Sequence, residues 1–530
     1  MFITAQDNRL IVDFVTRDEE KKYYKLYGWK IRQGVANLED TWVNRLILDL
    51  PITRPRYVAQ REGVAGLLDF QRADVDKMIE WGSSLNANDM GLGKTIEALA
   101  YFHTLGLKSA VILTKKTCIS QWVSQIRKWL PNKNIKIIGY ISKKQKLPQN
   151  SNAPMIVVTN YEKLVGNCVK QGKVKVPVPN AFGDWLAGRR WDVVIADEAH
   201  ELRNMNTAKH ILADKIPSKF RIGLTGTPIV KHPDDLYGIL HWINPQIVGS
   251  SYWTFVDYFC NVDTTNPWGR KIVGLTKNEE KLEILHKLLD MIYIRNKIED
   301  VLSEMPEANE SVVLLDMSPK QEARYKQIKE LTLEELSEDI PIPNGLVQTI
   351  RLLQQSTCPM ILDKNAEWGP KYEFIGDWLE NDPDLRITVF SPYSQDIYYL
   401  EKYLETLHIK TSVVTGQKND KQRAEALSDF TSGKTRVFAG TIGAVGTGTD
   451  GLQKACHICI FLQKDWNPEP MKQAIARVRR LAQEQKVLIF YLECAHTVDQ
   501  RVGKISIQKV EDIRRVIDGE DVHYDDYRLL

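Results

Sequence analysis

Residues 88–95 of the chain read Asn-Asp-Met-Gly-Leu-Gly-Lys-Thr, and residues 197–200 read Asp-Glu-Ala-His. The first stretch is a glycine-rich turn, whose backbone N–H groups can surround phosphate oxygens. The second follows an apolar run, Val193–Ala196, of the kind that forms a central strand of a parallel sheet. Ligands of such sheets bind at the carboxyl ends of the strands. The two stretches together predict an α/β fold that binds a nucleotide.

The side chains within these stretches suit phosphoryl transfer. Lys94 would reach the β- and γ-phosphates, and the Thr95 hydroxyl would hold Mg²⁺. Asp197 would hold the same metal ion, and Glu198 would orient or deprotonate the attacking water. Asn88 stands where the common phosphate-loop pattern has its first glycine. The alternative, a glycine-rich turn without a ligand, accounts for the loop alone but not for the loop and the acidic stretch together.

Length and composition are typical of a globular protein with several domains. The chain has 530 residues, which is too long for one hydrophobic core. Its net charge of +3 does not by itself indicate nucleic-acid binding. No apolar run approaches the roughly 20 residues that span a bilayer, and the first residues lack the apolar stretch of a signal peptide. We therefore expect no membrane association and a cytoplasmic location.

The seven cysteines are scattered along the chain, as expected for reduced thiols. Cys456 and Cys459 form one Cys-x-x-Cys pair, and a zinc site would need a second pair with similar spacing. Because both cysteines lie on or beside an apolar strand, the sequence favours a structural role over metal binding.

Strand patterns alternate with helical patterns in two separate regions, which predicts two doubly wound α/β domains. The expected strands are Val111–Thr114, Ile135–Tyr140, Met155–Thr159, Asp192–Ala196 and Arg221–Thr225 in the first region, and Arg386–Phe390, Thr411–Thr415, Thr435–Ala439, His457–Leu462 and Lys486–Leu492 in the second. The expected divisions are a small separate N-terminal unit at 1–60, a first lobe at 61–245, a mostly helical insertion and linker at 246–365, a second lobe at 366–500, and a helix with a tail at 501–530. Only the first lobe carries a phosphate loop, so the second could close over it and complete its active site.

From about residue 66 to 505 the chain resembles the Swi/Snf-type ATPases of the superfamily-two helicase-like motors. Asp89-Met90-Gly91-Leu92-Gly93-Lys94-Thr95 matches the family's phosphate loop, and Asp197–His200 matches its acidic motif. Leu224–Pro228 matches the third motif, and Asp465-Trp466-Asn467-Pro468 begins the best match in the second lobe. The resemblance implies two tandem RecA-like lobes with ATP and Mg²⁺ as cofactors.

The resemblance also assigns roles residue by residue. Phe70 would stack on adenine and Gln71 would bond its edge, while Arg477 and Arg480 would act on the nucleotide from the second lobe. Because these arginines are three residues apart, we expect both on one helix face. The residues expected to couple hydrolysis to lobe movement are His200, Thr225, Thr227, Gly448, Asp450 and Gln473. The residues expected to contact the DNA backbone are Lys116, Thr117, Asn160, Tyr161, Ser391 and Thr441. At Asn296 the family usually has a second arginine, after Arg295.

The family implies ATP-driven movement along double-stranded nucleic acid. We therefore expect a DNA-stimulated ATPase that moves as a monomer on duplex or branched DNA and remodels DNA or protein–DNA complexes in repair, recombination or replication. Phe70–Ala73 and Pro267-Trp268-Gly269 are similar to the annealing-helicase, fork-remodelling branch. The compact chain favours a bacterial or viral source, with the protein at the nucleoid or in the host cytoplasm. The alternatives are a strand-separating DNA or RNA helicase and an ATP-dependent nucleic-acid clamp.

Overall fold

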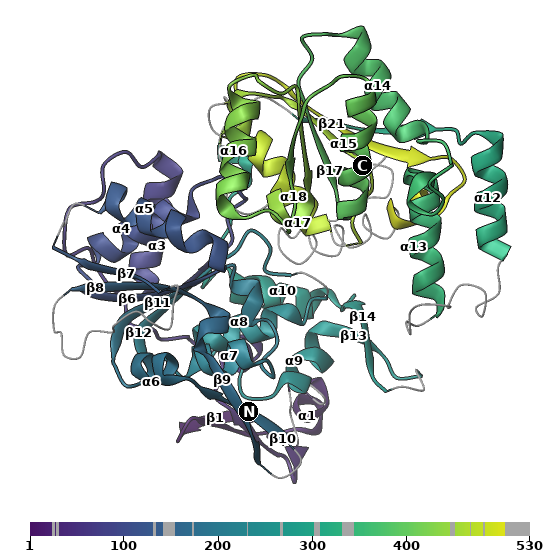
Figure 1. Ribbon diagram of the computed structural model, residues 1–530. Coiled ribbons are helices and arrows are strands. Elements are labelled where there is room, and N and C mark those ends of the chain that lie inside the picture. The colour runs from purple at the N-terminus through teal and green to yellow at the C-terminus, as the bar shows by residue number, and fades with distance from the viewer. Residues whose placement is uncertain are drawn as a thin grey trace. The chain divides into compact units, whose positions relative to one another are not determined.

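The computed structural model describes residues 1–23, 27, 31–130, 134–140, 154–171, 174–229, 232–265, 269–301, 308–330, 344–445, 451–466, 468–480 and 483–503. The chain divides after Val301 into two compact units, each built on its own parallel sheet (Figure 1). In the described part of the chain, no helix combines the length and the apolar character needed to cross a bilayer.

The first unit contains a seven-stranded parallel sheet in the order β15-β5-β12-β11-β6-β8-β7. Its strands are β5 (Ser84–Asn86), β6 (Ser109–Thr114), β7 (Lys136–Gly139), β8 (Met155–Asn160), β11 (Trp191–Asp197), β12 (Ser218–Leu224) and β15 (Tyr293–Ile294). The helical segments around this sheet are α3 (Asp69–Trp81), α4 (Lys94–Thr104), η1 (Lys116–Cys118), α5 (Ile119–Trp129), η2 (Tyr161–Leu164), α6 (Ala181–Ala187), η3 (Ala199–Leu202), α7 (Ala208–Asp214), α8 (Asp235–Ile243), α9 (Tyr252–Phe259), α10 (Glu279–Leu289) and α11 (Ile298–Val301).

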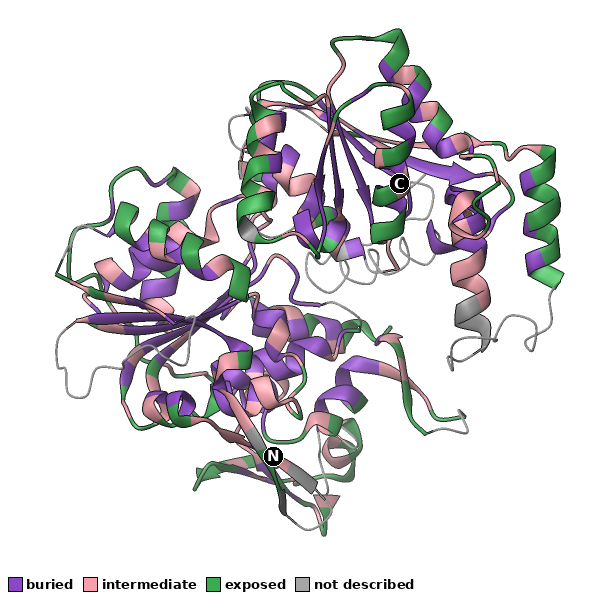
Figure 2. Cartoon of the chain, viewed as in Figure 1, coloured by how far each residue is buried: buried purple, intermediate pink, exposed green. Residues whose placement is uncertain are grey.

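Helices cover both faces of this sheet because successive strand residues point to opposite sides. Ala110 and Ile112 of β6 belong to a core shared with α3, α4 and α5. Val111 and Leu113 belong to a second core, shared with α6, α7 and α8. Figure 2 shows the strands as largely buried, as expected for a sheet with two covered faces. The doubly wound arrangement predicted for this region is confirmed.

Two antiparallel hairpins extend the first unit. They are β9 (Val165–Gln171) with β10 (Val174–Pro179), and β13 (Cys260–Asp263) with β14 (Lys271–Leu275). The sequence did not predict either hairpin. Pro267 and Trp268, which suggested the fork-remodelling branch, lie outside the described residues.

The second unit contains a six-stranded parallel sheet in the order β16-β21-β20-β17-β19-β18. Its strands are β16 (Ala308–Leu315), β17 (Ile387–Ser391), β18 (Thr411–Val414), β19 (Val437–Thr441), β20 (Ile458–Phe461) and β21 (Val487–Cys494). Its helical segments are α12 (Pro319–Glu330), α13 (Asn344–Thr357), η4 (Pro359–Ile361), α14 (Pro370–Asn381), α15 (Ser394–Thr406), α16 (Asp420–Thr431), α17 (Ile442–Val445), η5 (Leu452–Lys454) and α18 (Pro468–Val478). All five strands predicted here are present, so the second α/β lobe is confirmed as well.

The boundary between the units differs from the predicted one at 365/366. β16 pairs with β21 over eight residues, Ala308↔Val487 to Leu315↔Cys494, and so belongs to the second sheet together with the helices that follow it. The sequence of β16 hid this strand because Asn309 and Glu310 interrupt its apolar pattern. The expected helix after Val502 falls almost entirely outside the described residues.

Residues 1–60 are not a separate unit, contrary to expectation. They form the antiparallel sheet β1-β2-β4-β3, with β1 (Phe2–Gln6), β2 (Arg9–Asp13), β3 (Ile31–Arg32), β4 (Val35–Glu39) and the helices α1 (Arg17–Tyr23) and α2 (Trp42–Ile47). Leu10, Val12 and Leu38 share one hydrophobic core with α8 and α10. Trp42 N also donates to the Gln246 carbonyl at 2.9 Å. This segment braces the helical part of the first unit.

Candidate nucleotide site

The phosphate loop connects β5 to the N-terminus of α4. Gly91 and Gly93 have φ values of 92° and 91°, a left-handed conformation that glycine adopts without strain. A Cβ at Gly93 would lie 2.5 Å from Gln71 Nε2, so the loop has no room for a side chain there. Within the described residues, no backbone carbonyl accepts from the N–H groups of Gly91, Gly93, Lys94 and Thr95. These donors are free to bind an anion at the helix N-terminus.

Gln71 holds this loop in place from α3. Its Nε2 donates to the Leu92 carbonyl at 2.7 Å, and its Oε1 accepts from Leu68 N at 3.0 Å. The amide that was expected to read adenine is therefore engaged with the protein backbone in this structure. The adjacent Phe70 is half-buried, and its stacking on adenine stays a prediction.

Lys94 is bound to the loop that precedes it. Its ammonium group donates to the carbonyl oxygens of Asn88 at 2.6 Å and Asp89 at 3.1 Å. Burial lowers the pKa of Lys94, against the opposing effect of the nearby carboxylates, of which Glu198 has the largest influence. A phosphate would replace weak neutral acceptors with strong charged ones, so the lysine is placed for a tighter partner than it has here.

Asp197 ends β11 at the carboxyl edge of the sheet, as predicted. Its Oδ2 accepts from Thr114 Oγ1 and from Trp122 Nε1, both at 2.7 Å. Burial, followed by the charge of Glu198, raises the pKa of Asp197. Two hydrogen bonds to the same oxygen fix the rotamer of the carboxylate. Neither Thr114 nor Trp122 was predicted to contact this residue.

Glu198 lies one residue beyond the strand, with a φ of 55°. One oxygen of its carboxylate is 3.3 Å from His200 Nδ1, which is also 3.3 Å from Thr225 Oγ1. Thr225 Oγ1 in turn accepts from Thr227 N at 3.0 Å. Burial lowers the pKa of His200, which favours the neutral ring. The structure therefore brings together Glu198 and three of the six residues predicted to couple hydrolysis to movement, His200, Thr225 and Thr227.

The third motif also lies beside the phosphate loop. A Cβ at Gly226 would be 2.8 Å from Met90 Cγ and 3.7 Å from Lys94 Nζ, so a side chain there would fill the space next to the lysine. Thr95 and Asp197 offer the hard oxygen ligands that Mg²⁺ prefers. The described part of the chain contains no group of three or more His, Cys, Asp or Glu side chains that could cage a metal ion.

A buried polar cluster behind the loop explains Asn88. The Asn88 amide donates to Asp74 at 2.7 Å and to Glu97, and Asn86 donates to Glu97 at 2.5 Å. Asn296 reaches the same Asp74 oxygen at 2.7 Å. Burial, together with the charge of Asp74, raises the pKa of Glu97 to about 8. Asparagine at position 88 therefore anchors the loop to two buried carboxyl groups, which a glycine could not do.

Asp89 was expected to bind the cofactor, which stays a prediction; in this structure its carboxylate has partners within the protein. Its carboxylate pairs with Arg295 at 2.5 Å and accepts from Ile298 N at 3.0 Å. The backbone of the loop also pairs with the segment after β15, since Asp89 N donates to the Asn296 carbonyl at 3.0 Å. Asp89 thus ties the phosphate loop to the segment that leaves the first unit.

The residues expected to contact DNA fall into two groups. Lys116 and Thr117 have exposed side chains on η1, directly after β6. Tyr161 is buried and donates to the Asp197 carbonyl at 2.8 Å, and Asn160 is buried and donates to Glu162 at 2.6 Å. Ser391 is buried and donates to Asp396. In this structure the last three side chains have partners inside the protein, and their contacts with DNA stay predictions.

In the second unit, α18 carries Gln473 and Arg477 as half-buried residues. Arg480 lies two residues beyond the end of this helix, so the expected common helix face is not observed. Thr441 ends β19 and is also half-buried. Gly448 and Asp450 lie outside the described residues, as does Asn467.

Comparison with known proteins places these features in a family. A family model described as the SNF2-related domain matches residues 34–360, and one described as the helicase conserved C-terminal domain matches residues 370–482. The chain is 22% identical to the chromatin remodeling factor mit1 of Schizosaccharomyces pombe, over 93% of the chain and 36% of that protein. It is 25% identical to the human DNA excision repair protein ERCC-6-like, over 91% of the chain and 43% of that protein. The chain therefore spans about two-fifths of the length of these relatives.

Among solved structures, the Sulfolobus solfataricus SWI2/SNF2 ATPase core in complex with dsDNA is 21% identical. The match covers 89% of this chain and 96% of that one, with a TM-score of 0.40. Because this global similarity is low, the assignment of the fold rests on the two parallel sheets themselves.

Proposed function

This chain belongs to the family of SNF2-related domains, and on that premise we propose that it hydrolyses ATP with Mg²⁺ to move along double-stranded or branched DNA. The observation that carries the proposal is the meeting of Lys94, Gly226 and the Asp197–Glu198 pair at one edge of the first sheet. β12 lies between β5 and β11, so the third motif after β12 lies between the phosphate loop and the acidic motif.

The phosphate loop would bind the triphosphate. N–H groups at the start of α4 would donate to its oxygens, and Lys94 would exchange its carbonyl partners for them. Thr95 and Asp197 would hold Mg²⁺, which when bound offsets charge on the phosphates. Trp122 and Thr114 keep the Asp197 carboxylate from rotating.

Glu198 is the residue proposed to orient the attacking water. Its neighbour His200 bridges to Thr225, so a change at the carboxylate reaches the third motif through one buried side chain. Arg477 and Arg480 are proposed to stabilise charge on the transferred phosphoryl group. An arginine in that role is worth about 10³–10⁵ in rate.

The DNA contacts that we propose are those through Lys116 and Thr117. Both are exposed and follow a strand of the first sheet, where ammonium and hydroxyl groups suit phosphate oxygens. Such contacts position a protein on DNA without reading sequence. We propose further that the protein acts as a monomer in the cytoplasm, in DNA repair, recombination or replication. The relatives named for chromatin remodelling and excision repair support a role in remodelling DNA or its complexes.

The test is steady-state ATP hydrolysis without nucleic acid and then with single-stranded, duplex and forked DNA and with RNA. Strong stimulation by duplex or forked DNA is expected. Glu198→Gln should bind ATP and fail to turn it over, and Lys94→Ala should lose both properties. Stimulation by single strands or RNA alone would favour a strand-separating helicase. Absence of hydrolysis in every condition would favour a nucleic-acid clamp.

A further inference from the structure

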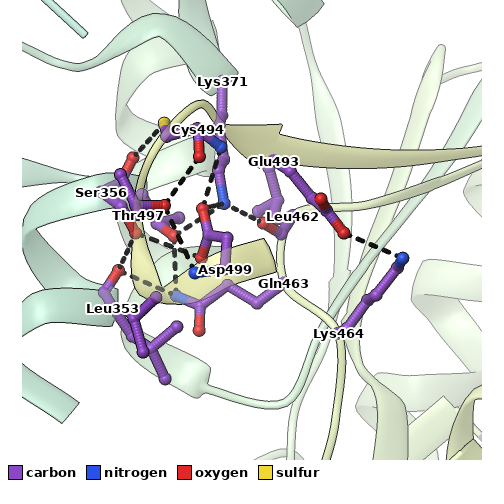
Figure 3. A network of polar contacts seen from close by, with 12 residues as sticks. Leu353, Ser356, Lys371, Leu462, Gln463, Lys464, Glu493, Cys494, Thr497 and Asp499 are labelled. Carbon is purple, nitrogen blue, oxygen red and sulfur yellow. Dashed lines mark hydrogen bonds and ion pairs between the residues drawn. The ribbon is translucent and has the colours of Figure 1, made fainter. Parts of the chain in front are cut away.

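Lys371, the second residue of α14, has a fully buried side chain that the proposed reaction does not use. Its ammonium group lies 2.8 Å from Asp499 Oδ2, 2.7 Å from the Leu462 carbonyl oxygen and 3.3 Å from Thr357 Oγ1 (Figure 3). These partners come from three parts of the second unit: the end of α13, the end of β20 and the segment after β21. One lysine therefore joins three elements at a buried point.

Stability alone is a poor explanation for this pair. Burial by itself would lower the pKa of Lys371, but Asp499 together with Cys494 and Asp396 outweighs that effect and raises the pKa, which favours the charged ammonium. A cation in the first turn of a helix is disfavoured by the helix dipole. Buried ion pairs are also often no more stabilising than apolar side chains of the same shape. The pair instead provides a fixed geometry, which apolar packing would not supply.

The geometry is fixed on the Asp499 side as well. Asp499 Oδ2 accepts from Cys494 N at 3.0 Å, and Oδ1 accepts from Ser356 Oγ at 3.2 Å. Asp499 itself is 5% exposed, so every one of these contacts is shielded from water. The carboxylate therefore has partners at the end of β21 and on α13 in addition to Lys371.

The segment that these contacts hold is Leu462–Lys464, directly after β20. The Leu462 carbonyl is held by Lys371. Gln463 Nε2 donates to Thr357 Oγ1 at 2.8 Å, and Lys464, whose side chain is only 7% exposed, pairs with Glu493 at 2.9 Å (Figure 3). Three consecutive residues thus each have a separate buried partner.

This segment leads into the arginine-bearing helix. Asp465 and Trp466 follow it, and α18 begins at Pro468. Asp465 N donates to Met471 Sδ at 3.4 Å, and Met471 is buried in the core of the second unit. The position of α18, and of Arg477 in its last turn, therefore depends on where Leu462–Lys464 is held.

We propose that Lys371 and Asp499 are positioning residues for the ATPase reaction, which set the placement of α18 through the Leu462 carbonyl without touching the nucleotide. The inference rests on the proposed function, in which Arg477 and Arg480 act on ATP. A displacement of about 1 Å in a group that orients a reaction can cost about 10²-fold in rate. Loss of the lysine should therefore affect turnover more than substrate binding.

The decisive variant is the double substitution Lys371→Met/Asp499→Asn. It removes the donor to Leu462 while leaving no unpaired charge in the core, and asparagine keeps an acceptor for Cys494 N or Ser356 Oγ. Asp499→Asn alone removes the ion pair but keeps the Lys371 ammonium as the donor to the Leu462 carbonyl. Its comparison with the double variant therefore distinguishes the effect of the ion pair from the effect of the Leu462 contact. The matched control is Lys434→Met/Asp429→Asn, which removes an exposed ion pair of 2.8 Å from the same unit.

Two measurements are made on the full-length variants. In DNA-stimulated hydrolysis, we expect kcat of the double variant to fall about 10–100-fold while the KM for ATP changes less than about twofold. In hydrogen–deuterium exchange, we expect peptides covering 462–478 to lose protection while those covering β17 keep it. Asp499→Asn should lie between the double variant and the wild type, and the exposed control should match the wild type in both measurements.

Three results would overturn the inference: an unchanged kcat, a kcat and KM that worsen together, or a loss of protection throughout the second unit. The last would show a purely structural role. If the wild-type protein hydrolyses no ATP under any condition, the proposed function fails on its own. The exchange pattern then still decides the positioning role, since local loss of protection at 462–478 supports it and uniform or absent change refutes it.

Discussion

Asp197 shows how single hydrogen bonds prepare a residue for its role. Thr114 and Trp122 both donate to Oδ2 of its carboxylate. Because these two bonds fix the orientation of the carboxylate, they also fix the direction of Oδ1. Groups that orient a metal-binding side chain typically account for about 10–100-fold in metal affinity or activity. Trp122 is therefore more than a core residue, although it is almost fully buried.

We expect Trp122→Phe to raise the Mg²⁺ concentration needed for half-maximal hydrolysis by about tenfold. Phenylalanine fills most of the same space and removes the Nε1 donor. The matched control is Trp129→Phe on the same helix, because Trp129 Nε1 donates to Gln125 rather than to the site. Equal Mg²⁺ dependence in the two variants would show that the hydrogen bond to Asp197 has no such role.

Asp396 is a residue whose ionisation should weaken the fold. It is buried beside Ser391, and burial raises its pKa to about 7, with Lys371 opposing and Asp499 adding to the shift. Because the unfolded pKa is near 3.8, the folded state binds more protons than the unfolded state between about pH 4 and pH 7. The free energy of unfolding therefore decreases as the pH rises through that window.

Asp396→Asn should remove this dependence. We expect the variant and the wild type to be alike near pH 4, and the variant to be more stable at pH 8, by on the order of 4 kcal/mol at most. The measurement is the urea midpoint of the second unit's transition across this range. Asp429→Asn, at an exposed position, serves as the control. Parallel pH profiles for Asp396→Asn and the wild type would contradict the prediction.

At the scale of single residues, the sequence predicted the positions that local backbone structure determines. It missed the side-chain contacts between residues that are distant in the chain. Gly93, Lys94 and Asp197 lie where the motifs place them, because a glycine-rich turn and the end of a buried strand are local features. Gln71, Asp89 and Ser391 were assigned to ligands, yet each is engaged by protein groups that become neighbours only on folding. The pairing of Asp89 with Arg295 joins residues 206 apart in the chain.

Among the elements, length and apolar content decided what could be predicted. Every strand predicted from an apolar run is present in one of the two parallel sheets. In the first sheet the strands that were missed, β5 and β15, have only three and two residues, and their pairing comes from the fold rather than from a local pattern. In the second sheet β16 was missed because Asn309 and Glu310 interrupt its apolar pattern. The two short strands β5 and β15 are also the ones that support the phosphate loop.

The pairing of β5 with β15 makes the phosphate loop continuous with the segment leaving the first unit. We expect a double-mutant cycle of Asp89→Asn and Arg295→Met to show a coupling energy of about 1–2 kcal/mol in the affinity for an ATP analogue. The physical reason is that the half-buried ion pair at 2.5 Å fixes both partners. The exposed pair of Asp69 and Arg72, at 3.2 Å on α3, is the comparison and should show a coupling near zero. Additive effects of the first two substitutions would show that the tie is not energetically significant.

On the scale of the whole molecule, the residues proposed to act in hydrolysis are divided between two units. The chain divides into its two units after Val301. Lys94 and Glu198 belong to the first unit, and Arg480 belongs to the second. If one chain supplies all three residues to one site, mixing a variant defective in the first unit with one defective in the second restores no hydrolysis. If the arginine of one copy serves the nucleotide of another, mixing the two defects restores some complete sites.

We therefore expect no recovery when Lys94→Ala and Arg480→Ala variants are mixed with duplex DNA and ATP. Arg480→Ala alone should lower kcat far more than it lowers ATP affinity, because an interaction that strengthens in the transition state acts on turnover. Hydrolysis by the equimolar mixture should then equal the mean of the two separate rates. Recovery approaching a quarter of the wild-type rate would instead show that two copies share a site, and it would replace the proposed monomer with a dimer on DNA.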